Sequence, residues 1–320
     1  MIVKLEDVWV RYPLSRGGLL STTYLHAVNG VTLEFEEGKI EGVIGESGSG
    51  KSTLGRTALR LIQPYRGKVY WDGVDVTKLP ERKLRKMRKD FQLIQQDPYG
   101  ALDPRLSVYD IVSEGLRVHK LVSSKDEERE LVLKTLASVK LTPPEAFAEK
   151  KPDELSGGQR QRVAIARALV MRPKFIVADE PVSMLDASTR GQILEILKET
   201  REKYGTSMMF ITHDIAIAAY ISDSISVIYG GTIVERADSD TIVRNPLHPY
   251  TAALIQAVPD PNPDKPVKEP NIKGEVEPLL DEPKGCVFYK RCPLAKDICR
   301  TERPKLREVG NGHYVACHLV

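Results

Sequence analysis

The stretch Gly45-Glu-Ser-Gly-Ser-Gly-Lys-Ser52 follows a short apolar run and precedes a segment whose apolar residues recur at helical spacing. It fits the pattern G-x-x-x-x-G-K-[ST], in which a glycine-rich loop joins a strand to a helix and cradles phosphates. Glycines let backbone N–H groups face a phosphate at the helix N-terminus, while Lys51 neutralises charge and the Ser52 hydroxyl binds Mg²⁺. The loop predicts a nucleotide site formed by Gly45, Ser47, Gly48, Ser49, Gly50, Lys51, Ser52 and Thr53.

Strand patterns surround this loop on both sides. Apolar and polar residues alternate around Ile2 to Tyr12 and again from Val31 to Phe35, which predicts antiparallel strands. From Ile40 onward, short apolar strands alternate with amphipathic helices, and this alternation indicates a parallel sheet. The predicted fold class is therefore α/β, with a parallel-sheet core of the P-loop NTPase (RecA-like) kind and an antiparallel β subdomain.

The middle of the chain has a different pattern. Residues from about 97 to 165 contain no convincing buried strand but several helical stretches, such as Ser124 to Val139, so we expect an inserted helical subdomain. Core strands resume at Phe175–Ala178 and Met208–Thr212, and Ser226 to Val234 predicts a closing hairpin around two glycines.

The composition changes again after Asn245. The stretch from Val258 to Pro283 carries seven prolines, too many for a helix or a central strand, and is expected to be a linker. We therefore divide the chain into residues 1–240, which hold the helical insertion, and residues 241–320, a small C-terminal extension. That extension contains all the cysteines of the chain, which points to a local site: Cys286, Cys292, Cys299 and Cys317.

Overall charge gives little sign of a nucleic-acid partner. Lysine and arginine total 47 against 44 aspartates and glutamates in 320 residues, a net charge of +3. The basic run Arg82 to Lys89 is the local exception, and a solvated helix face is favoured over a lipid or nucleic-acid patch. No stretch approaches the roughly 18 to 20 apolar residues of a spanning helix, and the N-terminus lacks a signal-peptide layout. We therefore expect a soluble, cytoplasmic chain.

Two carboxylates follow the predicted strand Phe175–Ala178. Asp179 and Glu180 would lie at its carboxyl end, where ligands of parallel α/β sheets bind. Asp179 can hold Mg²⁺ through its water shell, and Glu180 can polarise the water that attacks a phosphoryl group. The alternative, an acidic pair that only caps the next turn, is disfavoured by the phosphate-binding loop upstream.

The motif Leu155-Ser-Gly-Gly-Gln159 narrows the choice among phosphate-binding families. It is similar to the signature of ABC ATPases, and with the preceding motifs the chain resembles that family from residue 1 to about 235. Physically, Ser156 can cap a helix whose N-terminal amides a phosphate can approach. The resemblance implies that this phosphate belongs to ATP held by a second ABC ATPase subunit, contacted by Ser156, Gly158 and Gln159.

Four further positions match motifs of the family. Gln96 resembles the Q-loop glutamine that reaches Mg²⁺ and the water, and Asp186 resembles the D-loop residue at the dimer interface. His213 resembles the switch histidine that contacts the γ-phosphate, so the implied catalytic residues are Glu180, His213 and Gln96. Tyr12 is the candidate for stacking on adenine, although an aromatic residue beside a strand can equally belong to the core.

The tail indicates a subfamily. Asn245-Pro-Leu-His-Pro-Tyr-Thr251 and Cys286-Val-Phe-Tyr-Lys-Arg-Cys-Pro293 resemble the C-terminal region of oligopeptide and dipeptide importer ATPases, and other segments look like the F-type partner. The resemblance implies a peripheral ATPase on the cytoplasmic face of the membrane. Its implied partners are a D-type ATPase in a heterodimer, two integral-membrane permease subunits and an extracytoplasmic solute-binding protein.

The cysteines are separated by five, six and seventeen residues. The resemblance implies a [4Fe-4S] cluster held by all four thiolates, as such a cluster requires. Zinc is the main alternative because four cysteines also suit it, although the usual close pairs are absent. Unligated or oxidised thiols remain a third possibility, and His313 or His318 could replace one ligand.

Three other functions compete with a peptide-import motor. A sugar or oligosaccharide importer would use the same ATPase, because the solute is chosen by proteins outside this chain. A soluble ABC protein acting on DNA or ribosomes would carry duplicated cassettes or long coiled-coil insertions, which this sequence lacks. A regulatory subunit unable to hydrolyse ATP would have a degenerate site, whereas Lys51, Glu180 and His213 are intact.

Overall fold

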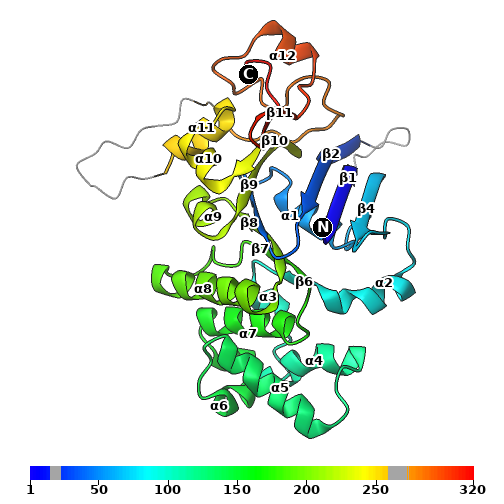
Figure 1. Ribbon diagram of the computed structural model, residues 1–320, viewed down its shortest axis with the longest axis vertical. Coiled ribbons are helices and arrows are strands. Elements are labelled where there is room, and N and C mark those ends of the chain that lie inside the picture. Colours follow the sequence, from blue (N-terminus) through cyan, green and yellow to red (C-terminus); the bar gives the residue numbers. More distant parts are fainter. Residues whose placement is uncertain (15–22, 259–271, 273) are drawn as a thin grey trace, which may run out of the picture.

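The alternating segments near the N-terminus pair as antiparallel strands, as predicted. The computed structural model describes residues 1–14, 23–258, 272 and 274–320. In it, β1 (Val3–Leu14) lies between β2 (Thr23–Phe35) and β4 (Arg66–Trp71), and β5 (Val74–Asp75) completes a four-stranded sheet (Figure 1). The glycine-rich segment 15–22 between β1 and β2 and most of the predicted proline-rich linker lie outside the described residues.

A second sheet of eight strands forms the centre of the molecule, in the order β11-β12-β10-β9-β3-β8-β7-β6. Five neighbouring strands are parallel, which confirms the predicted core: β3 (Ile40–Ile44), β6 (Phe91–Ile94), β7 (Phe175–Asp179), β8 (Ser207–Thr212) and β9 (Ser224–Tyr229). Every residue of β3, β7 and β8 is buried, as expected for parallel strands covered on both faces. The predicted hairpin pairs β9 with β10 (Thr232–Asp238).

Alternate residues of the parallel strands pack into two different cores. Ile176 of β7 belongs to the cluster shared with α7 (Gly157–Leu169) and α8 (Ala187–Tyr204). Its neighbour Val177 belongs to the cluster shared with α1 (Lys51–Ala58) and the antiparallel sheet. The parallel sheet is therefore the middle of three layers.

Residues 95–174 are all described and contain no strand. They form the helices α3 (Pro98–Ala101), α4 (Val108–His119), α5 (Lys125–Ser138), α6 (Pro144–Ala148), η2 (Pro152–Glu154) and α7. The predicted helical stretch from Ser124 is α5, whose N-cap Ser124 accepts a hydrogen bond from the Glu127 amide at 3.2 Å. Figure 1 shows α4, α5 and α6 at one end of the molecule and the C-terminus at the other.

The C-terminal region joins the main sheet. β12 (His313–Val315) pairs with β10 and with β11 (Arg307–Gly310). Neither β11 nor β12 was predicted from the sequence. Helix α9 (Ile215–Ile221) joins β8 to β9 within the parallel core. The helices after that core are α10 (Ser239–Arg244), α11 (Pro249–Gln256) and α12 (Asp297–Thr301). In the described part of the chain, none of the helices combines the length and the apolar character that crossing a membrane requires.

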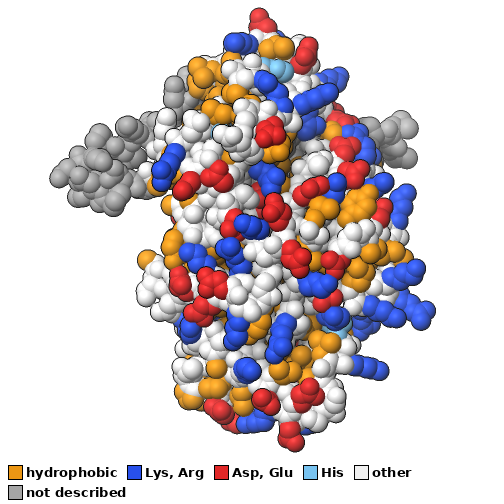
Figure 2. Space-filling model, in the orientation of Figure 1, with side chains coloured by type: hydrophobic (Ala, Val, Ile, Leu, Met, Phe, Trp, Pro, Cys, Tyr) orange, Lys and Arg blue, Asp and Glu red, His pale blue; other side chains and the backbone are white. Residues whose placement is uncertain are grey.

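The predicted basic run occupies α2 (Glu81–Met87) and η1 (Arg88–Asp90). Figure 2 shows lysine and arginine side chains gathered over the surface where Figure 1 places α2. Arg88 pairs with Glu81 and Lys89 with Asp90, each at 3.0 Å, while the other basic residues of α2 are exposed. Exposed basic side chains are expected of a solvated helix face and of a lipid or nucleic-acid patch alike, so the preference for the solvated face stays a prediction.

Candidate active site

The loop between β3 and α1 has a backbone that only glycine can follow at two points. Gly50 has φ +101°, and a Cβ atom on it would lie 2.3 Å from the carbonyl oxygen of Ala27. A Cβ on Gly45 would lie 2.2 Å from the carbonyl oxygen of Ile228. These contacts explain why the motif carries glycine there, since any side chain would displace the loop from the sheet edge.

Lys51 lies folded back into the loop at the start of α1. Its Nζ donates to the carbonyl oxygens of Gly45 at 2.7 Å and Glu46 at 2.8 Å, and the residue is 5% exposed. Burial lowers the pKa of Lys51, while the carboxylates of Glu180, Asp179 and Glu46 act in the opposite direction. The ammonium group is therefore held close to where the loop would receive phosphate oxygens.

The Ser52 hydroxyl donates to Oδ1 of Asp179 at 2.8 Å. Asp179 is 4% exposed, and burial raises the pKa of its carboxyl against the lowering effect of the Ser52 hydrogen bond. A hydroxyl and a buried carboxylate in contact form the oxygen-rich surroundings that Mg²⁺ prefers. These residues therefore fit Mg²⁺. The other predicted ligand, Gln96, hydrogen-bonds to Glu180, the residue that follows Asp179.

Glu180 is the point at which the three predicted catalytic residues meet. Its Oε2 accepts a hydrogen bond from Nε2 of Gln96 at 3.1 Å and lies 3.2 Å from Nδ1 of His213. Its φ of +47° falls in the left-handed region, which is uncommon for a residue other than glycine and is often found at functional sites. The amide of Glu180 donates to the Ile211 carbonyl at 3.0 Å, which ties this conformation to β8.

These groups open into one cavity of about 680 Å³. Predicted residues lining it are Tyr12, Ser47, Gly48, Gly50, Lys51, Ser52, Thr53, Gln96, Glu180 and His213. Tyr12 both lines the cavity and packs against the core, and its hydroxyl lies 3.4 Å from Oγ1 of Thr53. Either interpretation of Tyr12 therefore remains compatible with its position.

Of the other predicted nucleotide residues, Gly45 and Ser49 belong to the loop itself and Asp179 contacts Ser52. The signature and D-loop residues do not line this cavity: Ser156, Gly158, Gln159 and Asp186. Ser156 caps α7, with its Oγ accepting from the Gln159 amide at 3.4 Å while Gln159 Oε1 accepts from the Ser156 amide at 3.0 Å. Asp186 caps α8 and accepts hydrogen bonds from the amide and the hydroxyl of Thr189 at 3.0 and 2.7 Å. Thr189 also lies against Gly158, so the two motifs are neighbours on one surface.

The sequence missed four residues that line the cavity. Ala27 and Leu25 come from β2, and Leu254 comes from α11 in the C-terminal region. The fourth, Glu46, lies inside the motif, but its pattern leaves that position unspecified. No local signal marks Leu254, because it reaches the cavity through long-range packing.

The four cysteines form no disulfide with one another, and their thiols lie near enough to act on one another electrostatically. Burial raises the pKa of Cys286 to about 11, with smaller contributions from Cys299, Cys317 and Cys292, so the thiols are electrostatic neighbours. Across residues 1–14, 23–258, 272 and 274–320, however, no three His, Cys, Asp or Glu side chains form a group that could hold a metal ion. The expected cluster or zinc site is therefore not supported by this arrangement.

The histidines expected as substitute ligands have other partners. Nε2 of His313 lies 2.7 Å from Oε1 of the fully buried Glu235, and Nε2 of His318 lies 3.0 Å from the Glu302 carbonyl oxygen. The Glu235 carboxylate also accepts from the amides of Leu247 and His248. His313 therefore fastens β12 to β10 and the following loop, which is a structural role.

Two families of known proteins match separate stretches of the chain. Residues 28–183 match the family described as "ABC transporter", and residues 234–299 match "Oligopeptide/dipeptide transporter, C-terminal region". The chain is 42% identical over 323 residues to the oligopeptide transport ATP-binding protein AppF of Bacillus subtilis, covering 99% of this chain and 97% of that protein. It is 44% identical over 293 residues to a putative peptide import ATP-binding protein of Brucella ovis, covering 92% of each.

Solved structures agree with the fold. A dimeric ATP-binding cassette in a post-hydrolysis state with bound ADP and Pi is similar at a TM-score of 0.67 and 33% identity, covering 74% of this chain and 99% of that one. The share of this chain left uncovered is consistent with the additional C-terminal region.

Proposed function

Because the chain belongs to the ABC transporter ATP-binding proteins, we propose that it hydrolyses ATP to energise the uptake of oligopeptides or dipeptides through a separate permease. The observation that carries the hydrolytic part is the convergence of Gln96 and His213 on one carboxylate oxygen of Glu180, beside the phosphate-binding loop. The relatives' names and the matched C-terminal region support peptides over sugars or oligosaccharides.

In the proposed reaction, the loop amides and Lys51 hold the phosphates. Ser52 and Gln96, with Asp179 through its water shell, would hold Mg²⁺, which would supply charge neutralisation of the phosphates. Glu180 orients the attacking water, and His213 and Gln96 fix the direction of its carboxylate. Tyr12, which lines the same cavity, would contact the base in this proposal.

A second subunit completes the site in this account. Ser156, Gly158, Gln159 and Asp186 do not line the cavity of their own chain, so their proposed nucleotide is the one held by a partner ATPase. Met184, in the turn before Asp186, has 62% of its surface exposed, which suits a residue that becomes covered on association. We propose a heterodimer in which this chain is the F-type subunit and its partner is D-type.

The permease contact is proposed at a second cavity of about 370 Å³. It lies between β6, α4 and α7 and the end of α1, and its apolar lining includes the half-exposed Leu61 and Val118. Gln95 lines this cavity, and the next residue in the chain, Gln96, hydrogen-bonds to Glu180. A permease helix bound in the cavity would therefore contact a direct chain neighbour of the proposed catalytic residues. This contact would place the chain on the cytoplasmic face of the membrane.

Val118→Asp is expected to weaken association with the permease by at least about tenfold, because it forces a charge into an apolar contact. Binding of the purified chain to permease in lipid nanodiscs measures this directly. Val74→Asp is the matched control, since Val74 is equally exposed at 48% but lies on β5 outside the groove. Equal binding of the two variants would contradict the proposed docking site.

We further propose that the four cysteines bind an iron–sulfur cluster, on the strength of the donor set and the family resemblance. Anaerobically purified protein is expected to contain about four iron atoms per chain, and Cys299→Ser is expected to lose most of them. Ser138→Ala, on the distant helix α5, is the control. One zinc per chain would favour zinc in place of the cluster. Protein that contains no metal, yet folds and hydrolyses ATP normally, would contradict a metal site at the cysteines.

Uptake tests the proposed function. Proteoliposomes that contain the permease, both ATPase subunits and the solute-binding protein are expected to accumulate a labelled oligopeptide only when ATP is supplied on the side of the ATPases. Accumulation of a labelled oligosaccharide instead would keep the motor and replace the substrate. ATP-dependent activity in the absence of any permease, directed at DNA or ribosomes, would favour the soluble alternative.

A further inference from the structure

The phosphate-binding loop touches the C-terminal region through Glu46. Both carboxylate oxygens of Glu46 lie 3.0 Å from Nη1 of Arg291, a residue 245 positions away that sits between two of the cysteines. The Arg291 side chain is only 9% exposed, and that of Glu46 is 29% exposed. The pair is therefore partly shielded from water, and salt screens it less than it would screen an ion pair on the surface.

Glu46 places a negative charge beside the phosphate-binding site. It lines the same cavity as Lys51 and Gly48, where a nucleotide would place several negative charges. It is also close enough to Lys51 to raise the pKa of that ammonium group, although burial, which lowers this pKa, and the carboxylates of Glu180 and Asp179 have larger effects. An uncompensated carboxylate here would repel the phosphates that the loop amides attract.

The backbone at Arg291 is held by hydrogen bonds. It belongs to a turn in which the amides of Arg291 and Cys292 both donate to the Phe288 carbonyl at 3.0 Å. Phe288 is 1% exposed, and its ring packs against Tyr229 and Tyr250 with centroids 5.1 and 5.3 Å apart.

Tyr250 connects this aromatic cluster to the loop backbone. Its hydroxyl oxygen accepts a hydrogen bond from the Glu46 amide at 2.8 Å, and the residue is fully buried. Tyr229 adds a second contact, with its hydroxyl 3.4 Å from Nη1 of Arg291. The side chain and the backbone of Glu46 are thus both fixed by residues outside the loop, which preorganises them.

We propose that Arg291 is a positioning residue of the nucleotide site, which neutralises Glu46 and so makes the C-terminal region necessary for full ATP affinity. This inference goes beyond transport, and it depends on the proposed function only in assuming that the loop binds ATP. The family motifs assign the loop, but they do not assign a role to Glu46 or Arg291.

A double-mutant cycle on the full-length chain tests it, with a fluorescent ATP analogue and Mg²⁺ to measure Kd. Arg291→Gln is expected to raise Kd about tenfold, because Glu46 then faces the phosphates uncompensated. Glu46→Gln is expected to bind as tightly as wild type or up to about fivefold tighter, and the double variant is expected to return to within about twofold of wild type. Lys290→Gln is the control, since Lys290 is 59% exposed in the same turn and pairs with Glu277.

Two further readouts separate charge compensation from a merely structural role. The difference in Kd between Arg291→Gln and wild type is expected to shrink as the salt concentration is raised. In turnover assays, KM for ATP is expected to change in parallel with Kd, while kcat at saturating ATP changes less than about twofold. Arg291→Lys should retain most of the affinity. Should Arg291→Gln misfold, the single Glu46 variant and the double variant still test the charge effect.

An unchanged Kd in Arg291→Gln would overturn the inference, and so would a double variant that binds as weakly as Arg291→Gln. A wild-type chain that binds no ATP would instead overturn the proposed function itself. The two failures are therefore distinguishable in the same titration.

Discussion

Glu180→Gln is expected to lower ATP turnover at least about a hundredfold while leaving ATP affinity within about twofold of wild type. The amide keeps the size and the hydrogen-bonding reach of the carboxylate, so contacts with Gln96 and His213 can persist. It lacks the negative charge with which Glu180 is proposed to orient and polarise the attacking water. Steady-state phosphate release and nucleotide titration, on the assembled ATPase pair, measure the two quantities.

Two comparison variants sharpen this result. Lys51→Ala is expected to show the opposite pattern, a large loss of ATP binding, because the ammonium group inside the loop is removed. Glu199→Gln is the matched control, an identical change on the exposed surface of α8, and should leave both quantities unchanged. Turnover that survives Glu180→Gln would remove the proposed catalytic role.

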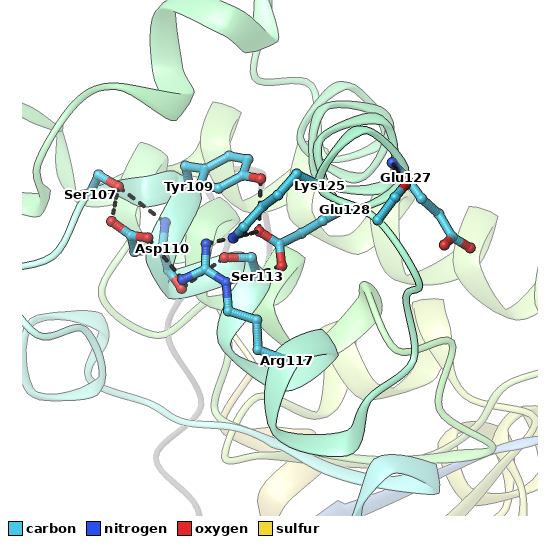
Figure 3. A network of polar contacts seen from close by, with 9 residues as sticks. Ser107, Tyr109, Asp110, Ser113, Arg117, Lys125, Glu127 and Glu128 are labelled. Atoms are coloured by element: carbon cyan, nitrogen blue, oxygen red, sulfur yellow. Dashed lines mark hydrogen bonds and ion pairs between the residues drawn. The ribbon is translucent and has the colours of Figure 1, made fainter.

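Glu128→Gln is expected to lower the free energy of unfolding of the helical region by about 2–3 kcal/mol. Glu128 is 3% exposed, and its carboxylate accepts hydrogen bonds from Arg117, Tyr109 and Lys125 at 2.8 to 3.2 Å (Figure 3). The loss should lie at the low end for a buried pair, because Arg117 keeps its contact with Asp110 at 3.1 Å. Hydrogen exchange of the α4 and α5 amides measures the change locally.

The effect of Glu128→Gln should also depend on pH. The hydrogen bonds from Arg117 and its neighbours hold the pKa of Glu128 at about 2, below its ordinary value. A lowered folded-state pKa means that the carboxylate contributes its full stability above the unfolded-state pKa of about 4.3 and loses it as the pH falls towards 2. The gap between wild type and variant should therefore be largest near pH 7 and shrink below about pH 4.5.

Glu127→Gln provides the control for both measurements. Glu127 is exposed, and Figure 3 shows its side chain pointing away from the Arg117 network. Its carboxylate accepts a hydrogen bond from the Ser123 amide at 2.7 Å, which glutamine can also accept. A change below about 0.5 kcal/mol is expected, and equal destabilisation by the two variants would contradict the role assigned to Glu128.

The sequence predicted the parts of the site that local rules govern. The glycine-rich loop between a strand and a helix, and the carboxylates after β7, follow from motif chemistry and from where parallel strands end. That placement also explains why Gln96, Glu180 and His213 meet, because each follows a strand of one parallel sheet: β6, β7 and β8 respectively.

Contacts between distant segments were beyond that reasoning. Tyr250 and Arg291 reach Glu46 across 204 and 245 positions, and no periodicity or spacing encodes such a contact. The strands β11 and β12 span four and three residues, too short for an alternating pattern to stand out. The tail was therefore predicted to be an extension separate from the main domain, whereas its strand β12 pairs with β10 and extends the central sheet.

The cysteines illustrate a different limit. Their grouping in the tail predicted that they lie together, and the electrostatic proximity of the four thiols agrees with that. Spacing along the chain does not fix whether the sulfur atoms converge on one point, and among the described residues no three His, Cys, Asp or Glu side chains form a group that could hold a metal ion. The partnership of His313 with the buried Glu235 was equally invisible in the sequence.

ATP turnover of the reconstituted transporter tests the central claim most directly. The chain, its partner ATPase and the permease are placed in lipid, and phosphate release is followed with solute-binding protein that is empty, peptide-loaded or oligosaccharide-loaded. The account predicts that the peptide-loaded protein alone stimulates turnover, and that Glu180→Gln abolishes the stimulated rate. Turnover indifferent to the peptide-loaded protein, or stimulated only by the oligosaccharide-loaded one, would contradict a peptide-import motor.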